Sequence, residues 1–244
     1  MISPYQTDSH RDELSQHGRS PAPRSKVQSV HTPESVRSEI PVRRSGVGLK
    51  GLAILALSPF TIASIRLRGT FGRAWAHALL ARQTKSSVPL SLVILGTAEI
   101  QGTGRVKFGE NLLLYRELYF ETQEAGSIMI GDDVVISRGA HIVSFDRIEI
   151  GAGTMIGEYS SIRDANHRVG GPNLVRYSGH DAKPIKIGRN VWIGRSVAVL
   201  PGVTIGDNAV IGANAVVTHD IPDFAVAVGV PARAISKTNN GRVG

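Results

Sequence analysis

The chain has 244 residues, a formal net charge of +8 and no cysteine. This length accommodates one sizeable domain with appended segments. The lack of cysteine excludes disulfide bonds, cysteine-ligated zinc sites and thiol nucleophiles. Aromatic residues make up only 5% of the chain, so we expect a core built from aliphatic side chains.

The positive charge is confined to the first third of the chain. Residues 1–50 hold 8 Lys/Arg and 5 Asp/Glu, residues 51–90 hold 5 Lys/Arg and no acid, and residues 91–244 hold 15 of each. A nucleic-acid-binding protein is expected to carry its basic residues on the folded domain. The neutral C-terminal region therefore argues against a nucleic-acid partner.

The N-terminal third predicts a tail followed by helix. Residues 1–46 are rich in Ser, Pro, Arg and His and predict a disordered tail, and we expect no signal peptide, because no apolar stretch follows the N-terminus closely. Residues 47–90 predict an apolar and basic helical segment, in which Pro59 interrupts the apolar run 52–65. This run is shorter than the ~20 residues that cross a bilayer. Two interpretations stay open: helices packed on the domain, or peripheral contact of residues 50–75 with an anionic membrane.

Aliphatic residues recur every six positions from residue 91 onward. The clearest block comprises Ile187, Ile193, Val199, Ile205, Ile211 and Val217. A fixed short period is typical of a parallel β-helix, in which six residues form one side and one corner of each coil. The tetrapeptides IGRN, IGDN and IGAN supply Gly and Asn, which tolerate tight corners. We therefore predict an all-β domain over residues 91–235, followed by a C-terminal tail over 236–244.

The six-residue phase breaks between Ile162 and Ile187, which lie 25 positions apart. The segment 164–184 contains DANHRVGGPNLVRYSGHDAKP and shows no periodicity. It predicts a loop that leaves the β-helix wall, with His167 at its start. Interruptions of a regular scaffold often carry function, so this loop is the first candidate for a site.

Residues 130–234 resemble the galactoside, maltose and polysaccharide O-acetyltransferases of the hexapeptide-repeat family. The matching pieces are ANH at 165–167, KPIKIGRNVWIG at 183–194, VLPGVTIGDNAVIGANAVVTHDIP at 199–222 and VAVGVPARAI at 226–235. The resemblance implies a left-handed parallel β-helix and a homotrimer with active sites between adjacent subunits. It also implies acetyl-CoA as acyl donor and no metal. The N-terminal extension is similar to that of colanic-acid-type exopolysaccharide acetyltransferases, which implies a cytoplasmic enzyme, at the inner face of the membrane if residues 50–75 contact lipid.

The resemblance assigns the reaction and its residues. It implies acetyl transfer to a hydroxyl of a sugar in a surface polysaccharide precursor, with His167 as the general base, because an imidazole titrates near neutral pH. The residues matched to acetyl-CoA positions are Trp192, Gly194, Arg195, Ala213, Thr218, His219 and Arg233. The residues expected at the acceptor are Ser137, Asp146, Asp164 and His180. His180 is also a competing base, and Asp164 or Asp181 is a candidate to orient His167.

Two positions depart from the family pattern. His219 stands where the family often has Lys, and Arg195 stands where many relatives have a small residue.

Three other functions stay open to different degrees. A γ-class carbonic anhydrase needs three imidazole ligands with a close pair, and His167 and His180 are 13 positions apart. N-acetylation of an amino sugar and a non-catalytic scaffold are the remaining alternatives.

Overall fold

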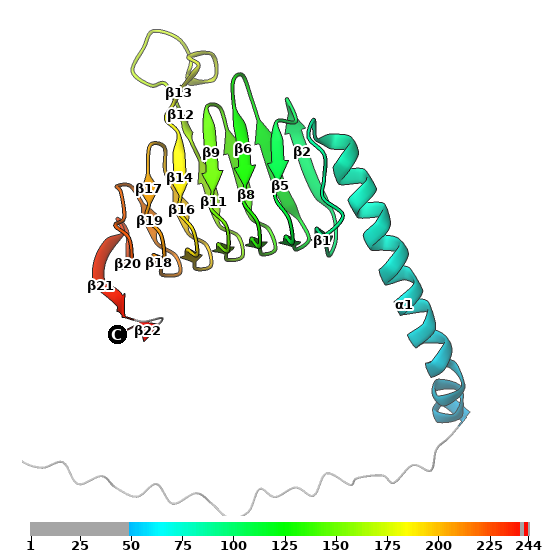
Figure 1. Cartoon of the computed structure of the whole chain (residues 1–244). Coiled ribbons are helices and arrows are strands. Elements are labelled where there is room, and N and C mark those ends of the chain that lie inside the picture. The colour runs from blue at the N-terminus through cyan, green and yellow to red at the C-terminus, as the bar shows by residue number, and fades with distance from the viewer. Residues whose placement is uncertain (1–48, 240–241, 244) are drawn as a thin grey trace, which may run out of the picture. The chain divides into compact units, whose positions relative to one another are not determined.

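The computed structural model describes residues 49–239 and 242–243 and contains one long helix followed by a β-solenoid (Figure 1). The predicted tail over residues 1–46 lies outside the described residues. Among the described residues, no helix is long and apolar enough to span a membrane.

Helix α1 (Leu49–Gln83) is continuous through Pro59, the residue that interrupts the apolar run of the sequence. Proline has no N–H to donate to the carbonyl four residues earlier, which here belongs to Leu55. The Ser58 hydroxyl donates to that carbonyl at 3.0 Å and so replaces the missing backbone donor. At its C-terminal end the helix packs on the first coil through Ala76 and Leu80, which are both buried.

Three sheets of short parallel strands form the solenoid, and each coil visits sheets A, B and C in turn. Sheet A contains β1 (Val93–Ile94), β4 (Leu113–Leu114), β7 (Val135–Ile136), β10 (Met155–Ile156), β15 (Trp192–Ile193), β18 (Val210–Ile211) and β20 (Ala225–Val228), and then the antiparallel strands β21 (Arg233–Asn239) and β22 (Arg242–Val243). Sheet B contains β2 (Ala98–Gly102), β5 (Leu118–Thr122), β8 (His141–Ser144), β11 (Ser161–Arg163), β16 (Ala198–Val199) and β19 (Val216–Val217). Sheet C contains β3 (Val106–Phe108), β6 (Ser127–Ile130), β9 (Arg147–Ile150), β14 (Ile185–Ile187) and β17 (Thr204–Ile205).

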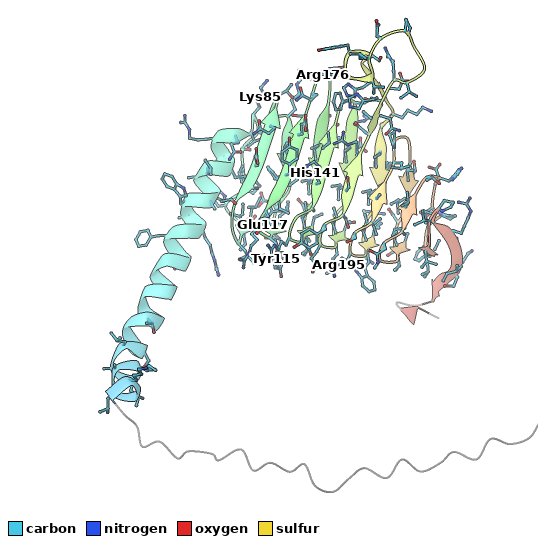
Figure 2. The ribbon with its side chains drawn as sticks, turned by 180° about the vertical axis from the view of Figure 1, so that it is seen from behind. Lys85, Tyr115, Glu117, His141, Arg176 and Arg195 are labelled. Atoms are coloured by element: carbon cyan, nitrogen blue, oxygen red, sulfur yellow. The ribbon has the colours of Figure 1, made fainter. Side chains whose placement is uncertain are left out.

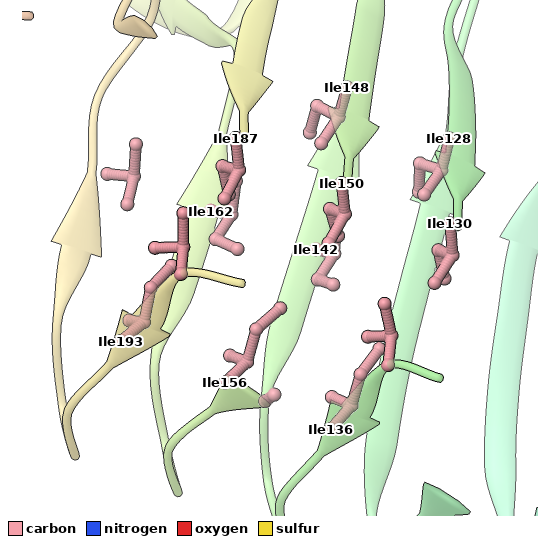
Figure 3. Close-up of a cluster of buried hydrophobic side chains, with 14 of the residues drawn as sticks. Ile128, Ile130, Ile136, Ile142, Ile148, Ile150, Ile156, Ile162, Ile187 and Ile193 are labelled. Atoms are coloured by element: carbon pink, nitrogen blue, oxygen red, sulfur yellow. The ribbon is translucent and has the colours of Figure 1, made fainter. Parts of the chain in front are cut away.

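The core is a stack of aliphatic rungs, as the six-residue period predicted. The in-phase residues from Ile187 to Val217 are each at most 1% exposed. Equivalent side chains lie one coil apart in register, for example Ile156 with Ile193 (Figure 3). Ile94, Ile100 and Val106 extend this stack toward the N-terminus and are also buried. The prediction of a parallel β-helix is confirmed.

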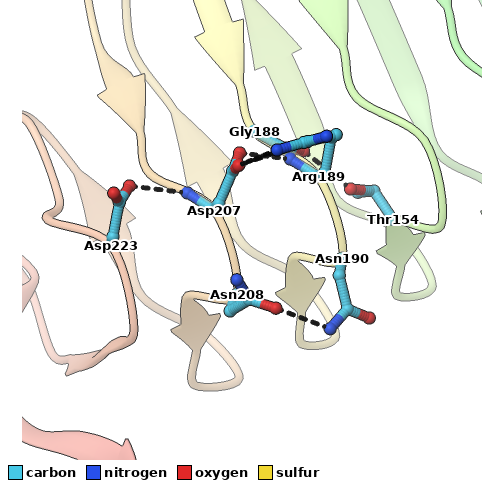
Figure 4. A network of polar contacts seen from close by, with 7 residues as sticks. All are labelled: Thr154, Gly188, Arg189, Asn190, Asp207, Asn208 and Asp223. Carbon is cyan, nitrogen blue, oxygen red and sulfur yellow. Dashed lines mark hydrogen bonds and ion pairs between the residues drawn. The ribbon is translucent and has the colours of Figure 1, made fainter.

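Asparagine and glycine have different roles at the corners of the coils. Asn190 and Asn208 adopt left-handed conformations, with φ of 54° and 60°, and Asn190 Nδ2 donates to Asn208 Oδ1 at 2.8 Å (Figure 4). Gly188 has no positive φ, but a Cβ there would lie 2.5 Å from Asp207 Oδ1. Asparagine therefore makes the turn, and glycine allows the next coil to approach closely.

Candidate active site

The segment around His167 is a hairpin that leaves the solenoid between β11 and β14 (Figure 1). Strands β12 (Ala165–His167) and β13 (His180–Ala182) pair antiparallel, and the connection contains a short 3₁₀ helix, η1 (Val175–Tyr177). The sequence predicted an irregular loop here. The pairing register places His167 directly opposite His180, which brings the two candidate bases together.

Three rings lie in a row at the base of this hairpin. The ring centroids of His167 and His180 are 4.3 Å apart, and those of His180 and Phe145 are 4.2 Å apart. Phe145 follows β8, one coil earlier, and is half-buried like His180, whereas His167 is exposed. The solenoid therefore holds the His167 imidazole through His180 and leaves it accessible to a substrate.

Asp164 fixes the turn that carries Phe145. Its side chain is fully buried, and its carboxylate accepts hydrogen bonds from three donors: Ser144 Oγ at 2.8 Å, Phe145 N at 2.7 Å and Asp146 N at 3.0 Å. A carboxylate with no exposed surface does not reach an acceptor, so the structure corrects the expectation that Asp164 binds substrate.

The other candidate orienting group for His167 is also engaged elsewhere. The Asp181 carboxylate accepts a hydrogen bond from Arg168 Nε at 2.6 Å, and both side chains are exposed. The described contacts therefore give His167 a neighbouring ring, His180, in place of the carboxylate that the sequence suggested.

His167 borders a shallow depression of about 450 Å³. Its lining residues are Glu121, Gln123, Glu124, Phe145, Arg163, His167 and His180. Asp146 is exposed beside Phe145 but lies outside this set. Carboxylates, an amide and a guanidinium are suited to a hydroxyl-rich ligand, because each can accept or donate hydrogen bonds.

Sequence reasoning missed Glu121 and Arg163, although coil-to-coil register brings them together. Glu121 pairs with Val143, and Val143 pairs with Arg163. The residues of the first pair are 22 positions apart and those of the second pair are 20 positions apart. Paired residues of the later, regular coils are 18 positions apart. A fixed period therefore does not identify these neighbours.

A second hollow, the sheet-A groove, lies over β10, β15 and β18 and has a volume of about 570 Å³. The groove is lined by four of the residues matched to acetyl-CoA positions, Trp192, Gly194, Arg195 and Ala213, and also by Ser137, which was expected at the acceptor. Trp192 is 54% exposed and therefore faces outward. The groove is thus a largely apolar surface with one cation, Arg195, and one carboxylate, Glu158.

Arg195 and Gly194 have structural roles of their own beside this groove. The Arg195 guanidinium lies 5.8 Å from the centroid of the Tyr159 ring, a cation–π contact. Gly194 is buried, and a Cβ there would lie 2.7 Å from Ala213 N and 2.9 Å from Ile211 O. Coil packing alone therefore requires glycine at this position, whereas Ala213 is exposed and its small side chain leaves the groove open.

The remaining candidates for acetyl-CoA contact lie away from the groove. Thr218 and His219 follow β19 of sheet B, and Thr218 Oγ1 lies 2.7 Å from His219 Nδ1. Arg233 begins β21, is exposed and donates to Ala232 O at 3.0 Å. The sequence-selected residues therefore fall into separate groups on one chain.

The groove and His167 occupy different corners of the coils. The groove includes the turn from sheet A to sheet B, whereas the hairpin leaves between sheets B and C. Arg195 in the groove and Arg176 in the hairpin connection lie at opposite ends of the coils (Figure 2). One chain thus presents two separate candidate half-sites, the sheet-A groove and the depression beside His167.

Other polar features do not join either half-site. His141 stacks on Tyr119 with ring centroids 4.2 Å apart, and its pKa is lowered by burial and by the nearby charge of Arg163. Another hollow, of about 610 Å³, runs along the glycine corners of sheet C and contains none of the sequence-selected residues. In the described part of the chain, no three His, Asp or Glu side chains form a group that could hold a metal ion.

The comparisons with known proteins agree with this fold class. The family model "Bacterial transferase hexapeptide (six repeats)" matches residues 184–219, where the period is clearest. "Probable acetyltransferase Rv3034c" of Mycobacterium tuberculosis is 40% identical over 111 residues, which cover 45% of this chain and 37% of that protein. The chain thus spans little more than a third of that relative.

A second relative is matched over most of its length. "Putative lipopolysaccharide biosynthesis O-acetyl transferase WbbJ" of Escherichia coli is 35% identical over 149 residues, which cover 58% of this chain and 76% of that protein. Among solved structures, the N-acyltransferase AntD of Bacillus cereus has the same fold, with a TM-score of 0.54 and 21% identity over 62% of this chain and 83% of that one.

The fold defines a class, the β-helical transferases built from six-residue repeats. Within that class, the match over most of the Escherichia coli relative identifies the family. The chain belongs to the hexapeptide-repeat acetyltransferase family.

Proposed function

We propose that this protein transfers an acetyl group from acetyl-CoA to a hydroxyl of a sugar in a surface polysaccharide precursor, with His167 as general base. The observation that carries the proposal is the exposed His167 imidazole, held against His180 at the rim of a polar depression. The similarity to the Escherichia coli O-acetyl transferase supports the choice of a sugar hydroxyl.

The proposed reaction is a direct transfer. The acceptor hydroxyl oxygen attacks the thioester carbonyl carbon while His167 takes the hydroxyl proton, which forms a tetrahedral oxyanion and an imidazolium. The carbon–sulfur bond then breaks, the ester carbonyl re-forms, and the leaving thiolate takes the proton from the imidazolium. Atoms and charge balance without a covalent enzyme intermediate, which is consistent with a chain that has no cysteine.

The sheet-A groove fits acetyl-CoA, which is a co-substrate here. Its apolar lining, including Trp192 and Ala213, suits the pantetheine arm, and Arg195 provides a cation for a phosphate. The groove is also long enough to follow several coils, because its lining comes from β10, β15 and β18. Thr218, His219 and Arg233 are then candidates for the nucleotide end.

We further propose that the two half-sites meet between adjacent chains of a homotrimer. His167 and the groove lie at different corners of one chain, so a complete site needs the groove of one copy and the hairpin of another. A cyclic trimer closes such head-to-tail contacts into a ring with three equivalent sites.

The primary test is CoA release from acetyl-CoA in the presence of sugar acceptors. We expect His167→Ala to retain acetyl-CoA binding and to lose roughly 10²–10⁴ in kcat, the contribution typical of a general base. His141→Ala is the matched control, because His141 lies outside both half-sites, and it should leave kcat unchanged. Full activity in His167→Ala would contradict the proposed base, and absence of acetyl-CoA binding in wild type would favour a scaffold.

The acceptor atom is tested with paired substrates. Sugars that present a hydroxyl or an amine at the same carbon should be compared, and we expect the ester product to form. Preferential amide formation would replace O-acetylation with the N-acetylation that the sequence left open.

Subunit complementation tests the shared site. His167→Ala keeps an intact groove, and Ala213→Phe, which fills the groove with a ring, keeps an intact base. Co-expression of the two inactive variants should restore activity, because some interfaces then combine the intact half of each. Inactive mixed trimers would place both halves within one chain.

A further inference from the structure

Helix α1 carries large apolar side chains that the solenoid does not cover. Near its C-terminal end, Phe71 and Trp75 are 69% and 74% exposed, whereas Ala76 and Leu80 are buried. The spacing of four residues places Phe71 and Trp75 on one face of the helix, next to the stripe that packs on the first coil. Near its N-terminal end, Leu52, Ile54, Leu55 and Leu57 are also exposed, each by more than half.

The charge of the same segment has one sign. Residues 49–90 contain six basic residues, namely Lys50, Arg66, Arg68, Arg73, Arg82 and Lys85, and no Asp or Glu. The solenoid region, residues 91–244, is neutral by contrast, with 15 acidic and 15 basic residues. In the described part of the chain, α1 therefore combines exposed apolar side chains with basic residues, and its sequence contains no acidic residue.

We propose that α1 is a lipid-docking helix that adsorbs to an anionic membrane surface without crossing it. Tryptophan and phenylalanine side chains are suited to the boundary between headgroups and acyl chains, and basic residues gain about 1 kcal/mol each near anionic lipid. The C-terminal end of α1 is tied to the solenoid, because Ile100 N donates to Gln83 Oε1 at 2.8 Å. Adsorption of the helix therefore brings the β-helix to the membrane surface.

A second copy of the chain fits this surface less well. Helices that associate side by side need acidic residues to offset their basic ones at the edges of the contact. Two copies of α1 would instead bring five basic residues each into one contact, and the helix itself contains no carboxylate. Anionic phospholipid headgroups supply the missing negative charge, so charge complementarity selects lipid.

The test is vesicle sedimentation of the full chain, which needs no enzymatic turnover and is therefore independent of the proposed reaction. The full chain should sediment with vesicles of phosphatidylcholine and phosphatidylglycerol, less with phosphatidylcholine alone, and less at high salt because salt screens charge. Trp75→Glu and Phe71→Glu should each weaken binding roughly tenfold, as expected for removing one large apolar side chain from lipid.

The matched control is Ile235→Glu, because Ile235 is 65% exposed on β21, at the other end of the solenoid. It should sediment as wild type, and circular dichroism should show all three variants folded. Unchanged sedimentation of Trp75→Glu, or no sedimentation of wild type, would overturn the proposal. If Trp75→Glu had a lower molecular mass in solution than wild type in the absence of vesicles, the exposed face of α1 would instead be assigned to contact with a second copy of the chain.

Discussion

The rungs from Ile187 to Val217 and the hairpin between β11 and β14 are neighbours in the chain but are held in opposite ways. The rungs from Ile187 to Ile211 pair with coils on both sides, Val217 at the edge of sheet B pairs with one, and all bury their aliphatic side chains almost completely. The hairpin tip exposes Val169 by 77% and Leu174 by 72%, and a Cβ added at Gly170 or Gly171 would meet nothing within 4 Å.

We therefore expect the rungs to determine the stability of the fold and the hairpin base to determine the position of His167. The rungs are positioned by many contacts at once, so a change in one rung is felt by the coils above and below. The hairpin is held at its base, by three pairs between its own strands, by the tilted contact of the His180 ring with the Phe145 ring, and by the carboxylate of Asp164 beneath it. Substitutions in the rungs should therefore unfold the protein, and substitutions at the hairpin base should misplace His167.

The largest effect on stability should come from emptying a rung. Ile193 is fully buried and lies in register with Ile156 and Ile211. Ile193→Ala leaves a cavity that the stacked coils cannot close, and we expect a loss of about 2–5 kcal/mol of unfolding free energy. Leu174→Ala at the exposed hairpin tip is the control and should change stability by less than about 0.5 kcal/mol. Chemical denaturation measures both, and equal losses would remove the distinction between the regions.

A substitution at Asp164 should affect both properties. Asp164→Ala removes the acceptor of one hydroxyl and two backbone N–H groups, and an unpaired buried donor costs about 1–3 kcal/mol. The turn that carries Phe145 should then loosen, so kcat should fall as well. Asp164→Asn keeps the size of the side chain and should lose less of each. A stable Asp164→Ala protein with normal kcat would show that this turn does not position the hairpin.

The sequence predicted the solenoid well because its signal is carried by the inward residues themselves. Ile187 and Val217 lie in phase and are buried, and the corner asparagines lie where the tetrapeptides placed them. The continuity of α1 through Pro59 was not predictable in the same way, because one hydroxyl, that of Ser58, replaces the lost donor. A single compensating side chain cannot be recognised from the composition or the periodicity of the sequence.

The site was predictable only in part, for a related reason. His167 and the groove residue Trp192 were found from their motifs, but Phe145 and Glu121 reach the hairpin base through coils of irregular length. Asp164 looked like a site residue because it lies three positions from His167. Its burial follows from where the wall ends and the hairpin begins, which the six-residue pattern does not specify.

Two variants of His180 test whether this residue supports His167 at the hairpin base. If His180 acts as a supporting ring, His180→Phe should keep the ring contacts with Phe145 and His167 and should have nearly normal kcat. His180→Ala should lose about 0.5–1.5 kcal/mol of aromatic contact, which corresponds to roughly 2- to 12-fold in kcat if that contact holds His167 in place. Steady-state kinetics of the two variants separates this from the alternative. A loss in His180→Phe as large as that in His167→Ala would make His180 the base.

The smallest effect should come from His141, a half-buried histidine on sheet B next to the inward residue Ile142. Burial, and then the charge of Arg163, lowers the pKa of His141 below its usual value of 6.5. The folded state therefore disfavours the charged imidazole, so stability is complete above about pH 6.5 and declines as pH falls toward the lowered folded-state pKa. Because the side chain is partly exposed and solvent screens its charge, we expect Tm to fall by no more than about 2 °C for this group.

The matched variant is His141→Gln, which removes the titration and keeps a polar side chain beside Tyr119. Thermal melts of wild type and His141→Gln between about pH 7.5 and 5.5 should diverge only at the acidic end, because only there does wild type take up the proton at His141. The kcat of the two proteins should stay equal across this range, since His141 lies outside both half-sites. A change in kcat without a change in Tm would move His141 from the scaffold into the site. In that case sheet B itself would contribute to catalysis, and the separation between rung and hairpin would not hold.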